Sequence, residues 1–331
     1  MATIYSERDC DPAIIKSKRV AVIGYGSQGH AHALNLRDSG VDVTVGLYQG
    51  SKSWAKAEVE GLKVVLTEQA TQTCDVLMLN LPDGEMARIY SDSIAPHLRE
   101  GQALLFSHGF NIHYKLIAPP SDVDVILVAP KGQGHGVRRE YLKGGGLPAL
   151  IAVHQDASGS AKALGLSYGW ALGCARAMIV ESTFRDETEA DLFAEQAVLC
   201  GGTKELVKAG FETLVAAGYS PETAFFECLH ELKLIVDLLY EGGIAHMLER
   251  ISDTAEWGAY VGGPVVVGDE SRAAMRELLA RIQDGSFARE WIAESGSGKK
   301  RLHEFRAKER ETEIEKVGNE LRSHMAFLKN M

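Results

Sequence analysis

Apolar and polar residues alternate in two different ways along the chain. In the first part, short apolar runs rich in Val, Ile and Leu alternate with segments of helical periodicity and predict strands at 19–23, 41–47, 76–80, 103–107, 123–128 and 149–153. From about Glu181 the apolar residues recur at helical spacing instead, at 191–199, 203–217, 221–240 and 272–283. The pattern predicts an α/β fold with two domains: a doubly wound parallel sheet over residues 1–182 and an all-helical domain over residues 183–331.

Three glycines follow the first predicted strand at the point where a helix begins. Gly24, Gly26 and Gly29 form G-x-G-x-x-G in the strand-turn-helix context that makes this motif informative. Gly24 allows the tight turn, Gly26 lets a diphosphate approach the backbone, and Gly29 lets the helix pack on the strand. The diphosphate would lie against the free N–H groups around Ser27 and Gln28. The first domain is therefore predicted to be Rossmann-like and to bind a dinucleotide.

The segment after the second predicted strand bears on the choice of cofactor. Enzymes that use NAD commonly place an acidic residue there to bind the adenosine ribose, and none is present at this position. The segment instead contains Tyr48, Ser51, Lys52 and Ser53, whose hydroxyl and ammonium groups can hold a 2′-phosphate. A simple polar turn is the alternative. We expect NADPH to be favoured, with NADH as a second cofactor.

Two further side chains follow strands of the predicted sheet. His108 comes after the strand at 103–107, and Lys131 lies in a glycine-rich loop after the strand at 123–128. Because parallel strands bind ligands at their carboxyl ends, both residues are expected near the nicotinamide. A histidine at a strand end can also have a purely structural role.

Four carboxylates form two pairs in the helical part. Asp191 and Glu195 are four residues apart, as are Glu227 and Glu231, so each pair would lie on one helix face about one turn apart. Like charges at this spacing repel, and a cation between the two faces would compensate for them. Ligands that are all oxygen favour Mg²⁺ or Mn²⁺ over zinc. Ordinary solvated helix faces are the alternative.

Composition limits the remaining function classes. The chain has 331 residues, 45% of them hydrophobic, and a formal charge of −10, which argues against nucleic-acid and membrane-surface partners. No apolar run reaches the length of roughly 18 residues that a membrane span needs. The five cysteines are scattered without a CxxC pair, as in proteins of a reducing compartment. A cytoplasmic protein with a small-molecule ligand is expected.

The motifs together resemble those of one enzyme family, the ketol-acid reductoisomerases (acetohydroxy acid isomeroreductases) of the short-chain class I. The resemblance extends over nearly the whole chain and rests on GYGSQGHAHA at 24–33, SHGFNI at 107–112, APKG at 129–132, DLFAEQAVLCGG at 191–202, FECLHELKLIVD at 226–237 and ISDTAEWG at 251–258. It implies a knotted helical domain and an active site at a dimer interface, in a homodimer or a higher homo-oligomer. The family converts 2-acetolactate or 2-aceto-2-hydroxybutyrate to dihydroxy acids in valine and isoleucine biosynthesis, by a Mg²⁺-dependent alkyl shift and reduction by NADPH.

The resemblance also implies roles for individual residues. Asp191 would bridge two Mg²⁺ ions, with Glu195 on one ion and Glu227 and Glu231 serving the other. Ser252 would bind substrate, His108 would be the active-site histidine, and Lys131 would support the metal site. The positions that would hold the cofactor are Gly24, Tyr25, Gly26, Ser27, Gln28, Gly29, Tyr48, Ser51, Ser53, Asp83, Gly84, Glu85, Met86 and Gly134.

The chain departs from the family pattern near the cofactor. Tyr48 stands where an arginine is usual, which removes a bidentate phosphate contact and weakens the preference for NADPH. Other departures are Gln133, Gly136, Cys174, Met178 and Ala194. Two rival functions share the same glycine motif: a metal-free hydroxyacid or imine reductase, which leaves the carboxylate pairs unexplained, and a nucleotide-binding sensor without catalysis, which leaves the retained carboxylates, His108 and Ser252 unexplained.

Overall fold

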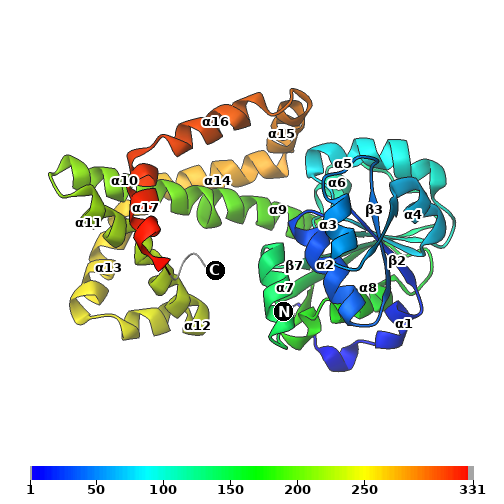
Figure 1. Cartoon of the computed structure of the whole chain (residues 1–331). Coiled ribbons are helices and arrows are strands. Elements are labelled where there is room, and N and C mark those ends of the chain that lie inside the picture. The colour runs from blue at the N-terminus through cyan, green and yellow to red at the C-terminus, as the bar shows by residue number, and fades with distance from the viewer. Residues whose placement is uncertain (1, 327–331) are drawn as a thin grey trace. The chain divides into compact units, whose positions relative to one another are not determined.

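The computed structural model describes residues 2–326 and divides into two compact units between Ala190 and Asp191 (Figure 1). Strand β9 (Ile179–Glu181) and helix α9 (Phe184–Ala194) flank the domain boundary expected near Ser182. Helix α9 continues across the division between the units. The boundary at residue 182 therefore stays a prediction, and the two units are described separately.

A nine-stranded sheet forms the centre of the first unit, in the order β1-β9-β8-β7-β6-β5-β2-β3-β4. The strands not yet given are β1 (Ile4–Tyr5), β2 (Arg19–Ile23), β3 (Asp42–Leu47), β4 (Lys63–Leu66), β5 (Val76–Leu79), β6 (Ala103–Phe106), β7 (Asp124–Pro130) and β8 (Ala149–Gln155). The ladders from β4 through β7 are parallel, which confirms the predicted Rossmann-like fold of this domain.

The sheet is mixed, because β8 runs antiparallel to β7 and β1 runs antiparallel to β9. After β7 the chain forms α7 (Gly134–Leu142) and then returns to the same edge, where Ala149 pairs with Pro130. The chain thus re-enters the sheet without first crossing to its amino edge. The predicted parallel direction was therefore wrong for the strand at 149–153, which is β8, whereas β1 was not among the predicted strands.

Alternate residues of β2 pack into different layers, as the two-residue period of a strand requires. Val20 and Val22 belong to one apolar cluster, with side chains from α1 (Pro12–Lys16), α2 (Ser27–Asp38), α3 (Trp54–Val59) and α8 (Ala161–Ala171). Ala21 and Ile23 belong to the other, with α4 (Thr67–Thr73), α5 (Asp83–Ile89), α6 (Phe110–His113) and the π-helix η2 (Tyr90–Ile94). Both faces of the sheet are covered, so ligands have access at its carboxyl edge.

The second unit is helical and has a small core. Val207 and Phe211 from α10 (Gly201–Ala216) pack with Phe225 from α11 (Pro221–Phe225). Ile314 from α17 (Glu313–His324) completes this core, so the charged tail includes a packing helix. The remaining helices are α12 (Leu232–Arg250), α13 (Asp253–Val266), α14 (Asp269–Gln283), α15 (Ser286–Gly296) and α16 (Lys300–Arg310).

Two of the predicted helices in this unit contain π-helical turns. The pattern at 191–199 changes from α9 to the π-helix η5 (Glu195–Leu199), and the pattern at 221–240 includes the π-helix η6 (Phe226–His230). Gly243 interrupts α12 with a φ of +85°. Glu195 and Glu227 lie in these π-helical turns, which often occur at functional sites.

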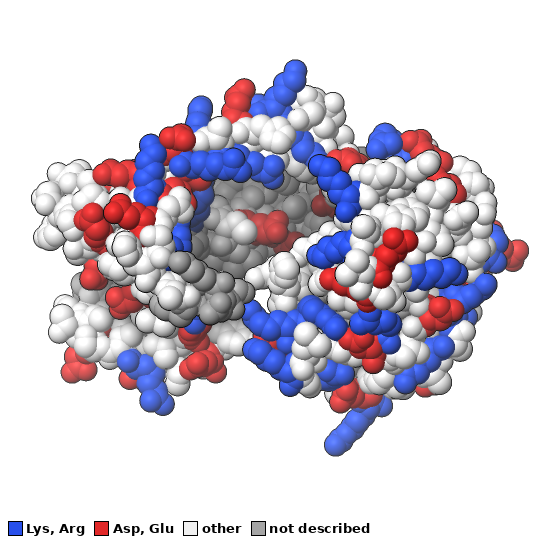
Figure 2. Space-filling view, viewed as in Figure 1, with Lys and Arg blue, Asp and Glu red and all other residues white. Residues whose placement is uncertain are grey.

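Two further observations concern the charged side chains on one face and the character of the helices. On the face shown in Figure 2, lysine and arginine side chains are interspersed with aspartate and glutamate over the first unit. Within residues 2–326, none of the helices has the length and apolar character that crossing a membrane requires.

Candidate functional site

A cavity of about 810 Å³ opens at the carboxyl ends of β2, β3, β5 and β6 in the first unit. It is lined by most of the predicted cofactor residues, namely Gly24, Tyr25, Gly26, Ser27, Gln28, Tyr48, Ser51, Ser53, Asp83, Glu85 and Met86. Gly29, Gly84 and Gly134 are not among its lining residues. Lys52 and His108 line it too, which puts His108 in the same cavity as the glycine loop.

The three motif glycines differ in what a side chain would meet. A Cβ at Gly24, whose φ is +96°, would lie 2.3 Å from the carbonyl oxygen of Asn80. A Cβ at Gly29 would lie 2.3 Å from the carbonyl oxygen of Gly24, whereas a Cβ at Gly26 would meet nothing within 4 Å. The turn thus requires Gly24, and the packing of α2 against the loop requires Gly29. Gly26 faces open space at the start of α2. The loop therefore fits a diphosphate at this helix start.

Gly134 supports the glycine loop from outside the cavity. A Cβ at Gly134 would lie 1.9 Å from the carbonyl oxygen of Ser27, so α7 can approach the loop this closely only with glycine there. Gln28 donates from Nε2 to the carbonyl oxygen of Gly132 at 2.8 Å. The loop after β7 and the glycine loop are therefore fixed to each other.

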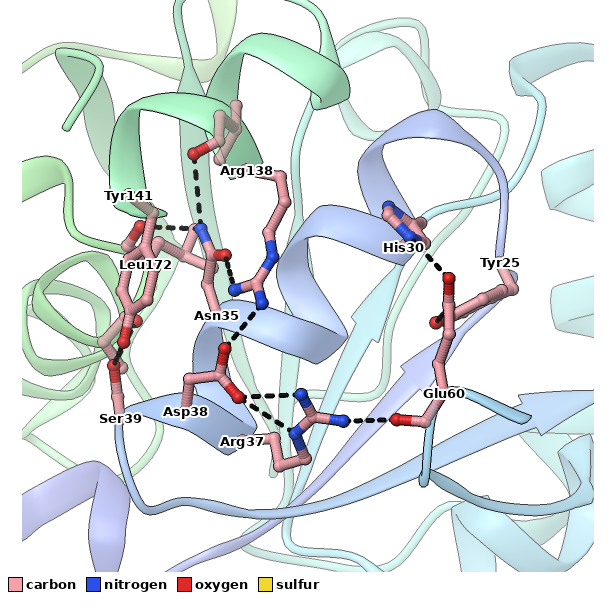
Figure 3. A network of polar contacts seen from close by, with 12 residues as sticks. Tyr25, His30, Asn35, Arg37, Asp38, Ser39, Glu60, Arg138, Tyr141 and Leu172 are labelled. Atoms are coloured by element: carbon pink, nitrogen blue, oxygen red, sulfur yellow. Dashed lines mark hydrogen bonds and ion pairs between the residues drawn. The ribbon is translucent and has the colours of Figure 1, made fainter. Parts of the chain in front are cut away.

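A polar network fixes the other side of the glycine loop (Figure 3). The Tyr25 hydroxyl donates to the Glu60 carboxylate, and Nε2 of His30 lies 3.2 Å from the other oxygen of the same carboxylate. Burial and the Glu60 bond raise the pKa of Tyr25, which therefore stays neutral. Arg37 donates to the Glu60 carbonyl oxygen. Because Glu60 follows α3 directly, the network connects the glycine loop to the helix that comes after residues 48–53.

A buried carboxylate, Glu187, lies beside both residues predicted at the strand ends. Its Oε2 is 3.2 Å from Nδ1 of His108, its Oε1 accepts from Nζ of Lys131 at 3.0 Å, and the Gly109 N–H donates to Oε2 at 2.9 Å. The Glu187 side chain is only 1% exposed. Burial alone would raise the pKa of Glu187, but its bonds to His108, Lys131 and Gly109 outweigh burial and lower it. Glu187 is thus held as a carboxylate.

Sequence reasoning missed Glu187. The signal was present, because Glu187 precedes Asp191 by four residues and both lie on α9, which places the two carboxylates on one face about one turn apart. Only the pairs further along the chain were recognised. The structure thus adds a carboxylate to the predicted series and connects it to His108 and Lys131.

Glu195, Glu227 and Glu231, the other predicted metal ligands, lie like Asp191 in the second unit. Glu195 begins η5, Glu227 is in η6, and Glu231 directly precedes α12. Across the described residues of this unit, no three His, Cys, Asp or Glu side chains bring ligand atoms within 4.8 Å of one another. The chemistry of these donors, all carboxylates, fits Mg²⁺.

Ser252, the predicted substrate-binding residue, is the N-cap of α13. Its Oγ accepts from the N–H of Ala255 at 3.2 Å, and the residue is exposed. A hydroxyl can still donate its hydrogen while it accepts this bond, so the capping role leaves a donor for a ligand.

The sheet, the glycine loop and the cavity define the class: a Rossmann-type protein that binds a dinucleotide. The family model for the acetohydroxy acid isomeroreductase NADPH-binding domain matches residues 14–178, and the model for the ketol-acid reductoisomerase C-terminal domain matches residues 184–327. The chain therefore belongs to the ketol-acid reductoisomerase family, which confirms the resemblance seen in the sequence.

Solved structures agree with this assignment. An NADH-preferring ketol-acid reductoisomerase from an uncultured archean is 46% identical, with a TM-score of 0.95 over 97% of this chain and 98% of that one. A semialdehyde dehydrogenase NAD-binding protein from Cupriavidus necator is 20% identical, with a TM-score of 0.60 over 80% of this chain and 97% of that one. A pyrroline-5-carboxylate reductase from Coxiella burnetii is 14% identical, with a TM-score of 0.53 over 81% and 98% of the two chains. The last two show the fold alone.

Proposed function

We propose that this ketol-acid reductoisomerase rearranges 2-acetolactate or 2-aceto-2-hydroxybutyrate with the help of two Mg²⁺ ions and reduces the product with NAD(P)H. The observation that carries the proposal is the position of Glu187. It contacts His108 and Lys131 at the strand ends, where His108 lines the dinucleotide cavity, and Asp191 follows it by one turn on α9. Glu187 thus contacts side chains at the strand ends and lies on the same helix face as Asp191. Oxidation of NADPH and formation of dihydroxyisovalerate from 2-acetolactate, with and without Mg²⁺, test the proposal.

The chain's own residues would position the substrate and handle its protons. Bound Mg²⁺ supplies Lewis acidity, which favours the deprotonated hydroxyl and polarises the neighbouring ketone. Lys131 and His108 surround the ionised Glu187, so this group of side chains has donors and an acceptor for protons that the rearrangement and the reduction move. The exposed hydroxyl of Ser252 would donate to the substrate carboxylate.

A second copy of the chain would complete the metal site. Glu195, Glu227 and Glu231 are exposed. Among the described residues of this unit, they do not form a cluster with ligand atoms within 4.8 Å of one another. The same unit exposes large apolar side chains on α12 and α13: Leu234 (56%), Tyr240 (84%), Ile244 (71%), Trp257 (70%), Tyr260 (59%) and Val265 (82%). Exposed apolar surface of this extent is typical of a protein interface. We therefore infer at least a homodimer, which light scattering coupled to size exclusion would reveal.

Residues 48–53, which follow β3, support a small preference for NADPH over NADH. Ser51, Lys52 and Ser53 line the cavity, and their hydroxyl and ammonium groups could hold a 2′-phosphate. Tyr48 also lines the cavity and is 67% exposed. Because this residue is a tyrosine, no guanidinium is available at this position to pair with a 2′-phosphate. The 46% identical relative is NADH-preferring, so a narrow margin between the two cofactors is consistent with it.

The cysteines support a reducing compartment such as the cytoplasm. All five are free thiols, and Cys10, Cys74 and Cys174 are buried. Burial raises the pKa of the Cys10 thiol to about 11 and that of the Cys174 thiol to about 12, so both stay protonated at neutral pH. Thiols of this kind contribute to packing and are poor nucleophiles.

A further inference from the structure

The cofactor cavity contains a carboxylate that comes from the strand next to the expected one. Strands β3 and β4 are parallel neighbours, and Leu47 at the end of β3 pairs with Leu66 at the end of β4. Tyr48 is the next residue after β3, and Glu68 follows β4 in the first turn of α4. Tyr48 and Glu68 both line the cavity. An acid absent from the end of β3 is therefore present at the end of β4.

The sheet order places Glu68 on the adenosine side of the cofactor. The glycine loop after β2 marks the diphosphate position, with β5 and β6 on one side and β3 and β4 on the other. His108 follows β6 and marks the nicotinamide half. In a fold of this type the adenosine ribose lies over the end of the strand corresponding to β3. Glu68 thus faces the half of the cavity that distinguishes NADH from NADPH.

The Glu68 side chain is held in one orientation as a charged group. Oγ of Ser93 in η2 donates to Oε1 of Glu68 at 2.7 Å, and Ser93 also lines the cavity. This bond is the main reason why the pKa of Glu68 is lowered, so the group is ionised at neutral pH. A carboxylate has a second oxygen that can accept from a ribose hydroxyl. The same charge would repel a 2′-phosphate.

We propose that Glu68 determines cofactor specificity: its carboxylate accepts from the adenosine ribose hydroxyls of NADH and opposes the 2′-phosphate of NADPH. Lys52 attracts the phosphate from the segment after β3, so the two charges act in opposite directions on one cofactor group. The inference rests on the proposed function only in that the cavity binds a nicotinamide dinucleotide. It would allow the cavity to bind NADH without an acid at the end of β3.

The test is a titration of the full-length protein with NADH and with NADPH in the absence of substrate, followed by cofactor fluorescence. Glu68→Gln is expected to raise the ratio Kd(NADH)/Kd(NADPH) about tenfold, which corresponds to the loss of one charge-assisted hydrogen bond. Ser93→Ala should shift the ratio in the same direction by a smaller factor. Glu100→Gln is the matched control. Glu100 is exposed in the turn before β6, so it lies at the amino ends of the strands, whereas the cavity is at their carboxyl ends.

Two results would overturn the proposal. An unchanged ratio in Glu68→Gln would show that Glu68 does not contact the discriminating group. Equal weakening of NADH and NADPH would show that it binds the adenine instead. If Glu68→Gln does not fold, Ser93→Ala decides the question, and a ratio equal to that of the wild type contradicts the proposal. Because no substrate is present, these results are independent of whether the enzyme converts 2-acetolactate.

Discussion

The ammonium of Lys131 lies 3.0 Å from Oε1 of Glu187, in a pair whose carboxylate is almost completely buried. Lys131 follows β7 and Glu187 lies on α9, so the contact joins the carboxyl edge of the sheet to the helix that continues to Asp191. A buried carboxylate needs such partners, because an unpaired charge there would cost several kcal/mol. The pair therefore fixes the first turns of α9 against the cofactor domain.

Replacing Glu187 by Gln should lower kcat on the order of 10²-fold and change the KM for NADPH little, because Glu187 does not line the cofactor cavity. The variant keeps the shape but removes the charge that balances Lys131 and His108. Steady-state kinetics with 2-acetolactate, together with circular dichroism to verify folding, check the prediction. Glu189→Gln, on the same helix, is the comparison variant. A kcat close to that of the wild type in Glu187→Gln would mean that the cluster is only structural.

The metal assignment predicts a loss of both reaction steps. Asp191→Asn or Glu231→Gln removes a negative oxygen ligand, so isomerisation and reduction should both fall on the order of 10²-fold or more. Reduction can be followed separately with the rearranged 2-ketoacid as substrate. Glu212→Gln, another carboxylate of the helical unit, should retain full activity. Normal turnover of 2-acetolactate in either ligand variant would contradict the assignment.

The residues at 48–53 predict that the preference between NADPH and NADH can be reversed. Ser51→Asp and Ser53→Asp together should shift the enzyme toward NADH, because carboxylates repel the 2′-phosphate and accept from ribose hydroxyls. The wild type should favour NADPH by a modest factor, since loss of the usual arginine costs about 10- to 100-fold in discrimination. Measured kcat/KM values for both cofactors decide. A double variant with unchanged selectivity, or a wild type that strongly prefers NADH, would show that this segment does not bind the phosphate.

A buried histidine predicts how stability depends on pH. The His32 side chain is completely buried, its Nδ1 lies 3.0 Å from the Tyr168 hydroxyl, and burial lowers its pKa to about 3 from an ordinary value of 6.5. The unfolded chain therefore takes up a proton below pH 6.5 that the folded protein does not, and stability falls as the pH decreases through the window from 6.5 to about 3.

This one group should cost about 2 kcal/mol between pH 6.5 and pH 5, at about 1.4 kcal/mol per pH unit. Urea unfolding of the wild type and of His32→Gln at both pH values measures the difference. The glutamine variant is expected to be less stable at pH 7 but to lose less stability on acidification. Equal pH dependence of the two proteins would refute this role for His32.

The parts of the fold that follow from local patterns could be predicted from the sequence. Gly24, Gly26 and Gly29 have a fixed relation to the strand before them and the helix after them, so the dinucleotide loop was predictable from residues close together in the chain. The antiparallel β8 was not, because its direction depends on where α7 returns the chain. Period-two patterns specify the faces of a strand and not its direction.

Residues of the site that depend on distant contacts were harder to predict. Glu187 is 79 positions from His108 and 56 from Lys131, and no local pattern predicts contacts of that separation. Glu68 was overlooked because an acid was sought only at the end of β3, whereas the pairing of Leu47 with Leu66 brings an acid from the end of β4 to the same cavity. The π-helical turns at Glu195 and Glu227 likewise differ from the regular helices that the apolar spacing predicts.

The most direct test of the account is the conversion of 2-acetolactate by the purified full-length protein with NADPH, with Mg²⁺ present and after its removal by a chelator. We expect one equivalent of NADPH to be oxidised per dihydroxyisovalerate formed with Mg²⁺, no turnover after chelation, and full recovery when Mg²⁺ is restored. Turnover that is unaffected by chelation, or oxidation of NADPH without the rearranged product, would contradict the proposed metal-dependent isomerisation and reduction.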